Sequence, residues 1–160
     1  MGGGHNLALL LRKTIERELP HLETLTEEGA DLPRGPGKWR PKEELGHLID
    51  SAANNHIRFA RGAVEDEFHG EGYAQEDWVR LHGYSGMPWR SIVSFWFQYN
   101  QLLAALIARI PPERLGTKCF IGSGPAVTLE FVIQDYVAHM QHHLDQLLRR
   151  EVVTPYSQLI

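Results

Sequence analysis

The stretch "VTLEFVIQDYVAHMQHHLDQL", residues 127–147, carries a clear helical pattern and decides the fold. Its apolar side chains recur every three or four residues, which predicts an amphipathic helix with one buried stripe. The stripe consists of Leu129, Val132, Ile133, Tyr136, Met140, Leu144 and Leu147. Thr128 is a suitable N-cap for this helix. We therefore expect a helix from about Thr128 to Arg150.

Three other long segments show the same periodicity. They run from about residue 6 to 25, from 41 to 64, and from 88 to just before the proline pair at 111 and 112. Pro20 is expected to kink or end the first of them. The polar connection between the second and third contains "QEDWVRLHG", which predicts a short helix. The fold class predicted from this pattern is all-α, a four-helix bundle with long connections.

The composition is typical of one globular domain. With 160 residues, of which 42% are apolar and 22% charged, the chain is long enough to bury a core. We expect a single domain over residues 1–160, with the glycine-rich residues 1–5 disordered. The net charge of −4 and the lack of a basic stripe interleaved with aromatic residues argue against nucleic acid as a partner.

We expect neither a secretory signal nor a membrane-spanning segment from this sequence. No run approaches the roughly 20 apolar residues that span a bilayer, so no membrane association is expected. The N-terminal charges follow the apolar run, which is the reverse of a secretory signal. The single cysteine, Cys119, cannot form an internal disulfide and is interpreted as a bystander. These features favour a cytoplasmic location.

Three histidines in five positions distinguish the helix quoted above. His139 and His143 are four residues apart, so their side chains lie one above the other and within reach of one metal ion. His142 points further out, toward solvent. Two readings of the pair stay open at this point: a metal site, or two histidines at the core edge that donate to carbonyl groups.

Two polar neighbours extend the metal hypothesis. A metal-bound histidine usually donates its second ring nitrogen to a carboxylate or a carbonyl group. Asp135 lies one turn before His139 and is placed for that role. Gln146 lies three residues after His143 and is a second candidate for a supporting contact, although an ordinary solvated side chain is the alternative.

A catalytic metal site typically uses three protein ligands, and periodicity does not identify the third. His56 lies near the centre of the apolar stripe of the helix over residues 41–64, as a core histidine would. His47 lies on the polar face, with Asp50, Ser51, Asn54 and Arg58. That face contacts either solvent or a wet cavity, and the pattern alone slightly favours solvent for His47. The tryptophans Trp39, Trp89 and Trp96 are interpreted as core or helix-staple residues.

Three motifs in order resemble a known family. They are "KWRPKEELGHL" at residues 38–48, "GHLIDSAANNHIRFA" at 46–60, and the quoted stretch at 127–147. Together they resemble the DinB-like superfamily, in particular its YfiT/BstA-like branch of metal-dependent hydrolases. The resemblance implies a four-helix bundle with an open three-histidine site for nickel or zinc, often in a homodimer. The chain departs from the branch at Gln141 and Asp145, where related sequences tend to carry further histidines.

The resemblance, and not the periodicity, assigns the first metal ligand to His47; it assigns the others to His139 and His143. One divalent ion per chain, zinc or nickel, is the implied cofactor. In a hydrolase of a small substrate, Asp50 or Ser51 would assist proton transfer. Asn54 and Arg58 would hold a substrate carboxylate, Arg58 by a bidentate contact; an interhelix ion pair is the alternative for Arg58.

Two other functions remain open from the sequence. An open metal position can bind and deprotonate a thiol, so a metal-dependent thiol S-transferase that uses bacillithiol, mycothiol or glutathione is the first alternative. The second is a metal-binding module without turnover. A structural zinc is normally closed by four protein ligands, so three nominated ligands favour an open, catalytic site.

Overall fold

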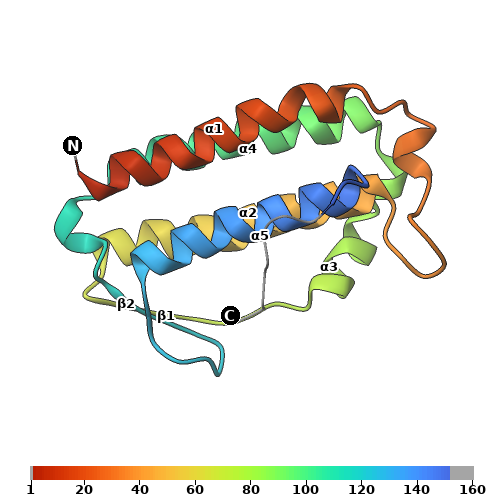
Figure 1. Cartoon of the computed structure of the whole chain (residues 1–160). Helices are drawn as coiled ribbons and strands as arrows, with labels where there is room; N and C mark the ends of the chain where they lie inside the picture. Colours follow the sequence, from red (N-terminus) through yellow and green to blue (C-terminus); the bar gives the residue numbers. More distant parts are fainter. Residues whose placement is uncertain (1, 152–160) are drawn as a thin grey trace.

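The computed structural model describes residues 2–151, and four long helices dominate it (Figure 1). The helices are α1 (Gly3–Glu23), α2 (Pro41–Val64), the short α3 (Gln75–His82), α4 (Trp89–Ala108) and α5 (Leu129–Leu147). Single turns of 3-10 helix occur at η1 (Gly29–Asp31), η2 (Tyr84–Gly86) and η3 (Pro112–Arg114). The predicted four-helix bundle and the predicted short helix are confirmed.

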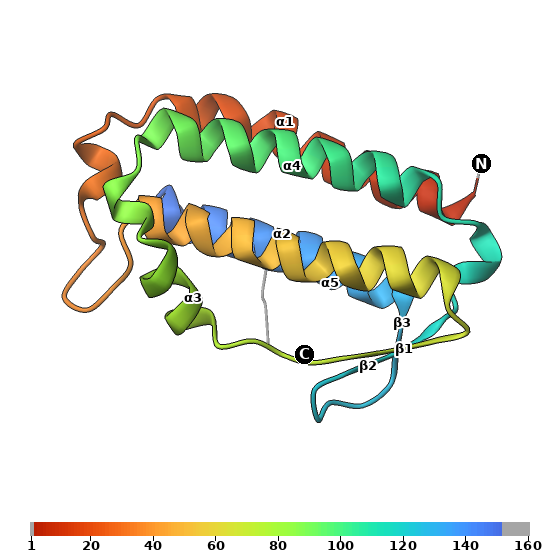
Figure 2. The ribbon, with the colours of Figure 1, turned by 180° about the vertical axis from the view of Figure 1, so that it is seen from behind.

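The order of the helices around the bundle differs from a simple up-and-down arrangement. α1 packs against α4 and α5, and α2 packs against the same two helices. Figures 1 and 2 show α1 beside α4 and α2 beside α5 from opposite sides. The consecutive helices α1 and α2 therefore lie across the bundle from each other. The long connections allow this order, because a short loop joins only neighbouring antiparallel helices.

A small sheet joins the two long connections, and the sequence prediction does not include it. Strand β1 (Glu67–Gly70) pairs in parallel with β2 (Lys118–Ile121), which pairs antiparallel with β3 (Val127–Thr128). β3 leads directly into α5, and Leu129 N donates to Thr117 O at 2.9 Å. The sheet thus holds the start of α5. Strands of two to four residues carry too short a pattern to be predicted, and only tertiary pairing stabilises them.

Three helix ends differ from the prediction. Residues 1–5 were expected to be disordered, and this is wrong for residues 3–5. They form the first turn of α1, where Gly4 is buried. Residue 1 lies outside the described residues. α1 continues past Pro20 to Glu23, because a proline in the last turn costs few helical hydrogen bonds. α5 ends at Leu147 rather than Arg150, and the backbone is left-handed at Arg149.

The local signals at the starts of α2 and α5 act as expected. Pro41 occupies the first turn of α2, and Arg40 N donates to Oε2 of Glu43 at 2.8 Å. Thr128 caps α5 by accepting from Phe131 N at 3.1 Å. Both helices that carry the candidate ligands therefore have defined starting points. No helix among residues 2–151 combines the length and apolar character that crossing a membrane requires.

Candidate metal centre

Three histidine side chains meet between α2 and α5. His47 comes from α2, and His139 and His143 come from adjacent turns of α5. One ring nitrogen of each residue lies within 4.8 Å of those of the other two. Nε2 of His47 and Nε2 of His139 are 3.1 Å apart. An ion with metal–nitrogen bonds of about 2.1 Å holds its ligand atoms at comparable separations, so the three rings fit one ion.

Some of the histidines of α2 and α5 belong to the cluster and others do not. The predicted pair His139 and His143 joins the cluster, whereas Nε2 of His142 faces Nε2 of Gln146 at 2.8 Å. The solvent position that periodicity favours for His47 is wrong, because its side chain is 0% exposed. α2 packs against both α4 and α5, so its polar face is covered as well as its apolar face. His56 is only half-buried and contacts Tyr99.

Burial keeps the inner two imidazoles neutral. Desolvation, together with the charge of His143, lowers the pKa of His47 to about 3. Desolvation and the neighbouring histidines also hold the pKa of His139 well below its ordinary value. Among the described residues, the buried Nδ1 of His47 has no hydrogen-bond partner. Neutral rings offer the lone pairs that a metal ion needs, and a bound ion would offset the cost of burying these polar groups.

Glu44 orients His143. Oε1 of Glu44, a residue only 1% exposed, lies 3.0 Å from Nδ1 of His143. A carboxylate only accepts, so Nδ1 carries the proton of this contact, and Nε2 is the nitrogen that can face a metal ion. Arg34 reaches the other oxygen of Glu44 at 3.3 Å. The sequence prediction does not include Glu44, although its position one turn before His47, on the same face of α2, is a signal that could have identified it.

Trp39 covers the histidines from the loop before α2. Its ring centroid lies 5.0 Å from that of His47 and 6.5 Å from that of His143. The indole is half-buried, so it separates the two imidazoles from solvent on that side. The interpretation of Trp39 as an ordinary core or staple residue misses this contact, since loop conformation is not readable from helical periodicity.

Asp50 lies one turn after His47 but makes its contacts elsewhere. Tyr84 donates its hydroxyl to Oδ1 of Asp50 at 2.6 Å, and Nδ1 of His82 is 2.9 Å from the same oxygen. Burial raises the pKa of Asp50, although both partners act against that rise. Within residues 2–151, Nδ1 of His47 has no hydrogen-bond partner, so Asp50 does not orient His47 directly. The predicted role of Asp50 in proton transfer stays a prediction.

A cavity of about 150 Å³ adjoins the histidine cluster. Ser51 and Arg58 of α2 and His139 of α5 form part of its wall. Asn54 does not line it; its amide donates to the carbonyl of Asp50 at 2.9 Å, along its own helix. The neighbouring Asn55 lines the cavity instead. Of the four catalytic or substrate-binding candidates that the sequence places on the polar face of α2, Ser51 and Arg58 thus line the cavity, whereas Asp50 and Asn54 do not.

The two predicted supporting residues on α5 lie in different surroundings. Asp135 lines the cavity together with His139, and its predicted hydrogen bond to that histidine stays a prediction. Gln146 accepts from Arg34 at 3.2 Å and contacts His142. Since Arg34 also pairs with Glu44, Gln146 is linked to His143 through two residues, Arg34 and Glu44.

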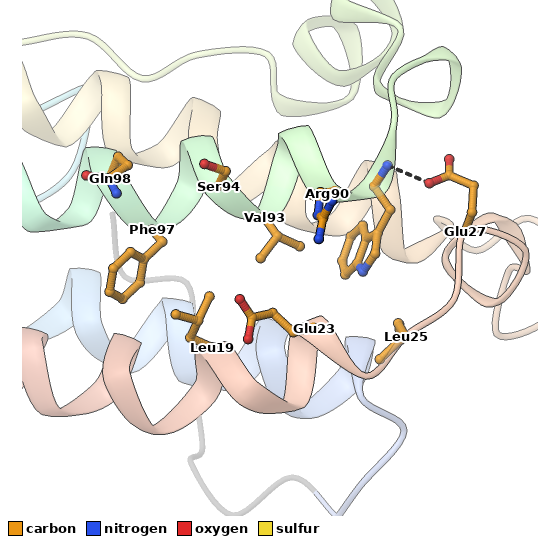
Figure 3. Close-up of a pocket in the computed structure, with 10 residues that line it drawn as sticks. Leu19, Glu23, Leu25, Glu27, Arg90, Val93, Ser94, Phe97 and Gln98 are labelled. Carbon is orange, nitrogen blue, oxygen red and sulfur yellow. Dashed lines mark hydrogen bonds between the residues drawn. The ribbon is translucent and has the colours of Figure 1, made fainter.

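A larger cavity lies elsewhere. It measures about 820 Å³ and runs between the ends of α1 and α4, where Leu19 and Phe97 face each other across it (Figure 3). None of the three clustered histidines lines it. Cys119 is fully buried in β2, and burial raises the pKa of its thiol to about 11, so it has none of the thiolate character of a reactive cysteine.

The geometry agrees with the family to which the sequence is assigned. A family model described as the DinB superfamily matches residues 10–147. The chain belongs to the DinB superfamily. The matched range contains all three clustered histidines and Glu44. The search of curated proteins finds no match.

A solved structure is similar over most of the chain. YfiT from Bacillus subtilis matches with a TM-score of 0.81 and 20% sequence identity, over 91% of this chain and 84% of that one. YfiT is described as a probable metal-dependent hydrolase with an unusual four-helix bundle topology. At this identity the likeness shows the fold, and the crossed helix order found here agrees with such a topology.

Proposed function

We propose that the protein is a metal-dependent hydrolase of a small substrate, with His47, His139 and His143 as the metal ligands. The single observation that carries this proposal is the histidine cluster beside a cavity whose wall includes His139. The description of YfiT as a probable metal-dependent hydrolase supports it by analogy. Three ligands leave a coordination position open, as catalytic sites do.

The residues of the chain define what the site can do. Bound zinc or nickel, the two metals proposed, would act as a Lewis acid and lower the pKa of a coordinated water toward ~7. Glu44 holds the Nδ1 proton of His143 and so keeps its other nitrogen available. Trp39 excludes water from one side of the site, which strengthens electrostatic interactions there.

The cavity residues have separate proposed roles. Ser51 lines the cavity and offers a hydroxyl group to a substrate or to a proton in transit. Asp50 contacts Tyr84 and His82 and would act through them rather than on the substrate itself. Arg58 is the proposed contact for an anionic group, with Asn55 taking the place predicted for Asn54. Asp135 is proposed to support His139.

A hydrolase is preferred over the two alternatives. A cavity of about 150 Å³ suits a molecule the size of benzene. Glutathione and mycothiol are much larger. In a thiol S-transferase, most of the thiol-bearing molecule would therefore have to lie outside the cavity. A structural zinc needs a fourth ligand, and the candidate metal-binding group found among residues 2–151 contains three residues. We also propose that the protein is a cytoplasmic homodimer. The location is supported by the sequence features, and the homodimer by the family resemblance.

The test is metal analysis of the purified protein. We expect about one zinc or nickel ion per chain in the wild type and in His142→Ala, and almost none in His143→Ala. His142→Ala is the matched control because it removes the neighbouring imidazole outside the cluster. A screen of small esters and amides then follows with the loaded wild type. Absence of metal from all three proteins after addition of zinc and nickel would overturn the proposal.

A further inference from the structure

Helix α4 differs from α1 in the side chains that it exposes. A helix on the surface of a bundle normally turns a charged side to water, and α1 does so. Its exposed charged residues are Arg12, Lys13, Glu16, Arg17 and Glu23. In α4, residues 91–108 contain no Asp, Glu, Lys or Arg. The outer side of α4 therefore consists of serine, glutamine and large apolar side chains, which is not typical of a helix that faces only water.

The exposed apolar side chains of α4 form a continuous surface with α2. Phe95, Tyr99 and Leu102 recur on one side of α4 at spacings of four and three residues. Phe95 and Leu102 are 56% and 53% exposed, and the ring centroids of Phe95 and Tyr99 are 5.7 Å apart. The hydroxyl oxygen of Tyr99 lies 3.1 Å from Nδ1 of His56 on α2, and the next residue, Ile57, is 57% exposed. These five residues define the α2–α4 face.

Helix α2 adds no exposed charge to the α2–α4 face. The exposed and half-buried residues of α2 between positions 45 and 60 include no Asp, Glu, Lys or Arg, because Asp50 and Arg58 are buried. Figure 2 looks onto this face, with α4 in front of α1 and α2 in front of α5. Exposed apolar residues that adjoin one another, rather than occurring singly, mark an interaction surface.

The absence of charge favours a second copy of the chain as the partner. Around a two-fold axis the same surface packs on itself, so a charged residue near the axis would meet its own kind and be repelled. A different protein would not require an uncharged surface, because opposite charges could then be complementary. The net charge of −4 opposes contact between two copies elsewhere. Self-association is therefore least opposed at the α2–α4 face.

The size of the α2–α4 face also suits a dimer. The 20 residues of α4 span about 30 Å, and two packed helices with axes 8–10 Å apart present a surface about 20 Å wide. The face thus offers on the order of 600 Å² per partner, close to the ~800 Å² of a standard interface. A lipid surface fits less well, because helices that lie on membranes are rich in Lys and Arg on their polar side.

We propose that two copies of the chain pair through the α2–α4 face, with Phe95, Tyr99 and Leu102 of each copy packed against the same face of the other. The proposal adds to the proposed homodimer the surface that forms it, and it rests on the proposed function for the dimeric state alone. None of the five residues of the face lines the cavity beside His139 or belongs to the histidine cluster. The contact therefore leaves the metal centre accessible.

The test measures the molar mass of the full purified chain at micromolar concentration, by light scattering during size-exclusion chromatography. We expect twice the mass of one chain for the wild type. Leu102→Glu should weaken dimerisation by at least about 100-fold, because each dimer would bury two unpaired carboxylates. Leu10→Glu is the matched control, since Leu10 is 46% exposed on α1, across the bundle from α2, and it should stay dimeric. A monomeric wild type, or a dimeric Leu102→Glu, would overturn the proposal.

A second variant guards against an effect on folding. Phe95→Gln places a neutral polar side chain on the same face and should weaken dimerisation about tenfold through lost apolar burial. Both substituted residues are more than half exposed, so the helix content measured by circular dichroism should not change. Dimerisation of Phe95→Gln with the affinity of the wild type would count against the α2–α4 face even if Leu102→Glu failed to fold.

Metal content measured on the same samples separates this proposal from the hydrolase. Leu102→Glu should hold as much metal as the wild type, because Leu102 belongs neither to the histidine cluster nor to the cavity wall. A wild type that binds metal but is monomeric would remove the proposed surface and leave the hydrolase standing. A dimer that Leu102→Glu dissociates, in a protein that binds no metal, would do the opposite.

Discussion

Helices α2 and α4 have similar lengths, 24 and 20 residues, and pack against each other, yet their interiors differ. Among the described residues, α2 buries seven polar or charged side chains and α4 buries one. Those on α2 are Lys42, Glu44, His47, Asp50, Ser51, Asn55 and Arg58, and the one on α4 is Asn100. The small polar cavity lies on the α2–α5 side of the bundle, and the large cavity lies between α1 and α4.

Cavity volume therefore does not locate the histidine cluster in this bundle, because the cavity of about 820 Å³ lies away from it and the cavity of about 150 Å³ adjoins it. Helix α4, on the apolar side of this comparison, stabilises the fold by burying apolar area, with Trp96 and Leu103 fully enclosed. The α2–α5 side gives up part of that stabilisation, because buried polar groups are costly unless they are paired. The Nδ1 of His47, which has no hydrogen-bond partner in the part of the chain described, is one such unpaired group.

The largest expected effect is on the apolar side. Trp96 is 0% exposed, so Trp96→Ala should lower the free energy of unfolding by about 3–5 kcal/mol through lost burial and a new cavity. Chemical denaturation measures this, and metal content per folded chain should remain that of the wild type. A large loss of metal from folded Trp96→Ala would show that the two sides are not independent.

Acid should destabilise the metal-free protein through His47, which is buried on the α2–α5 side of the bundle. The pKa of His47 falls to about 3 on folding, so below its unfolded value of ~6.5 the unfolded chain binds a proton that the folded chain does not. Its contribution to stability is therefore lost as the pH falls from about 6.5 toward 3, on the order of 4 kcal/mol at the lower limit. Denaturation across this range compares wild type with His47→Leu.

The variant His47→Leu tests the buried imidazole of His47 directly. His47→Leu should flatten part of the pH dependence and should be at least as stable as the metal-free wild type at neutral pH, because it replaces a buried ring with an unpaired nitrogen by an apolar side chain. It should also bind no metal. A steeper pH dependence than that of the wild type would contradict the neutral state inferred for His47.

Glu44→Gln tests the orientation of His143. The amide keeps the size of the side chain but no longer offers a carboxylate to Nδ1, which lies 3.0 Å away in the wild type. Metal affinity should fall by about 10- to 100-fold, as measured by competition with a chelator. Glu43→Gln, which alters a neighbouring carboxylate at the start of α2, is the control and should leave the affinity unchanged.

A smaller effect is expected where Tyr84 packs over α2. A Cβ added at Gly46 would lie 2.1 Å from Cδ2 of Tyr84, so Gly46→Ala must displace that ring and its hydrogen bond to Asp50. We expect a loss of about 1–3 kcal/mol in the free energy of unfolding. Gly72→Ala is the control, since its Cβ would meet no atom within 4 Å. Equal stabilities of the two variants would contradict the packing described here.

The smallest effect should come from the cavity between α1 and α4. Gln98 lines the cavity between α1 and α4, and Gln98→Ala should change the free energy of unfolding by no more than about 0.5 kcal/mol. Metal affinity and any hydrolytic activity should not change. A marked change in either would mean that the cavity of Figure 3 takes part in function.

The helices were predictable because each carries its own signal. The repeat of apolar residues in 129–147 predicts α5 and places His139 and His143 on one edge of its stripe, and both expectations agree with the structure. The start of α2 was equally readable from Pro41 and the acidic residues after it. The sheet was not, because each of its strands is too short to form alone and is stabilised by a partner far away in the chain.

The features of the candidate site were likewise only partly predictable from the sequence. The helices and the histidine pair of α5 could be predicted from the pattern of residues, and the choice of His47 came from family resemblance. The burial of His47, the contact of Glu44 with His143, and the position of Asn55 rather than Asn54 at the cavity depend on how the helices pack. Periodicity reports how apolar each face of one helix is. Which faces become buried depends on how many neighbours that helix has, and α2 lies against both α4 and α5.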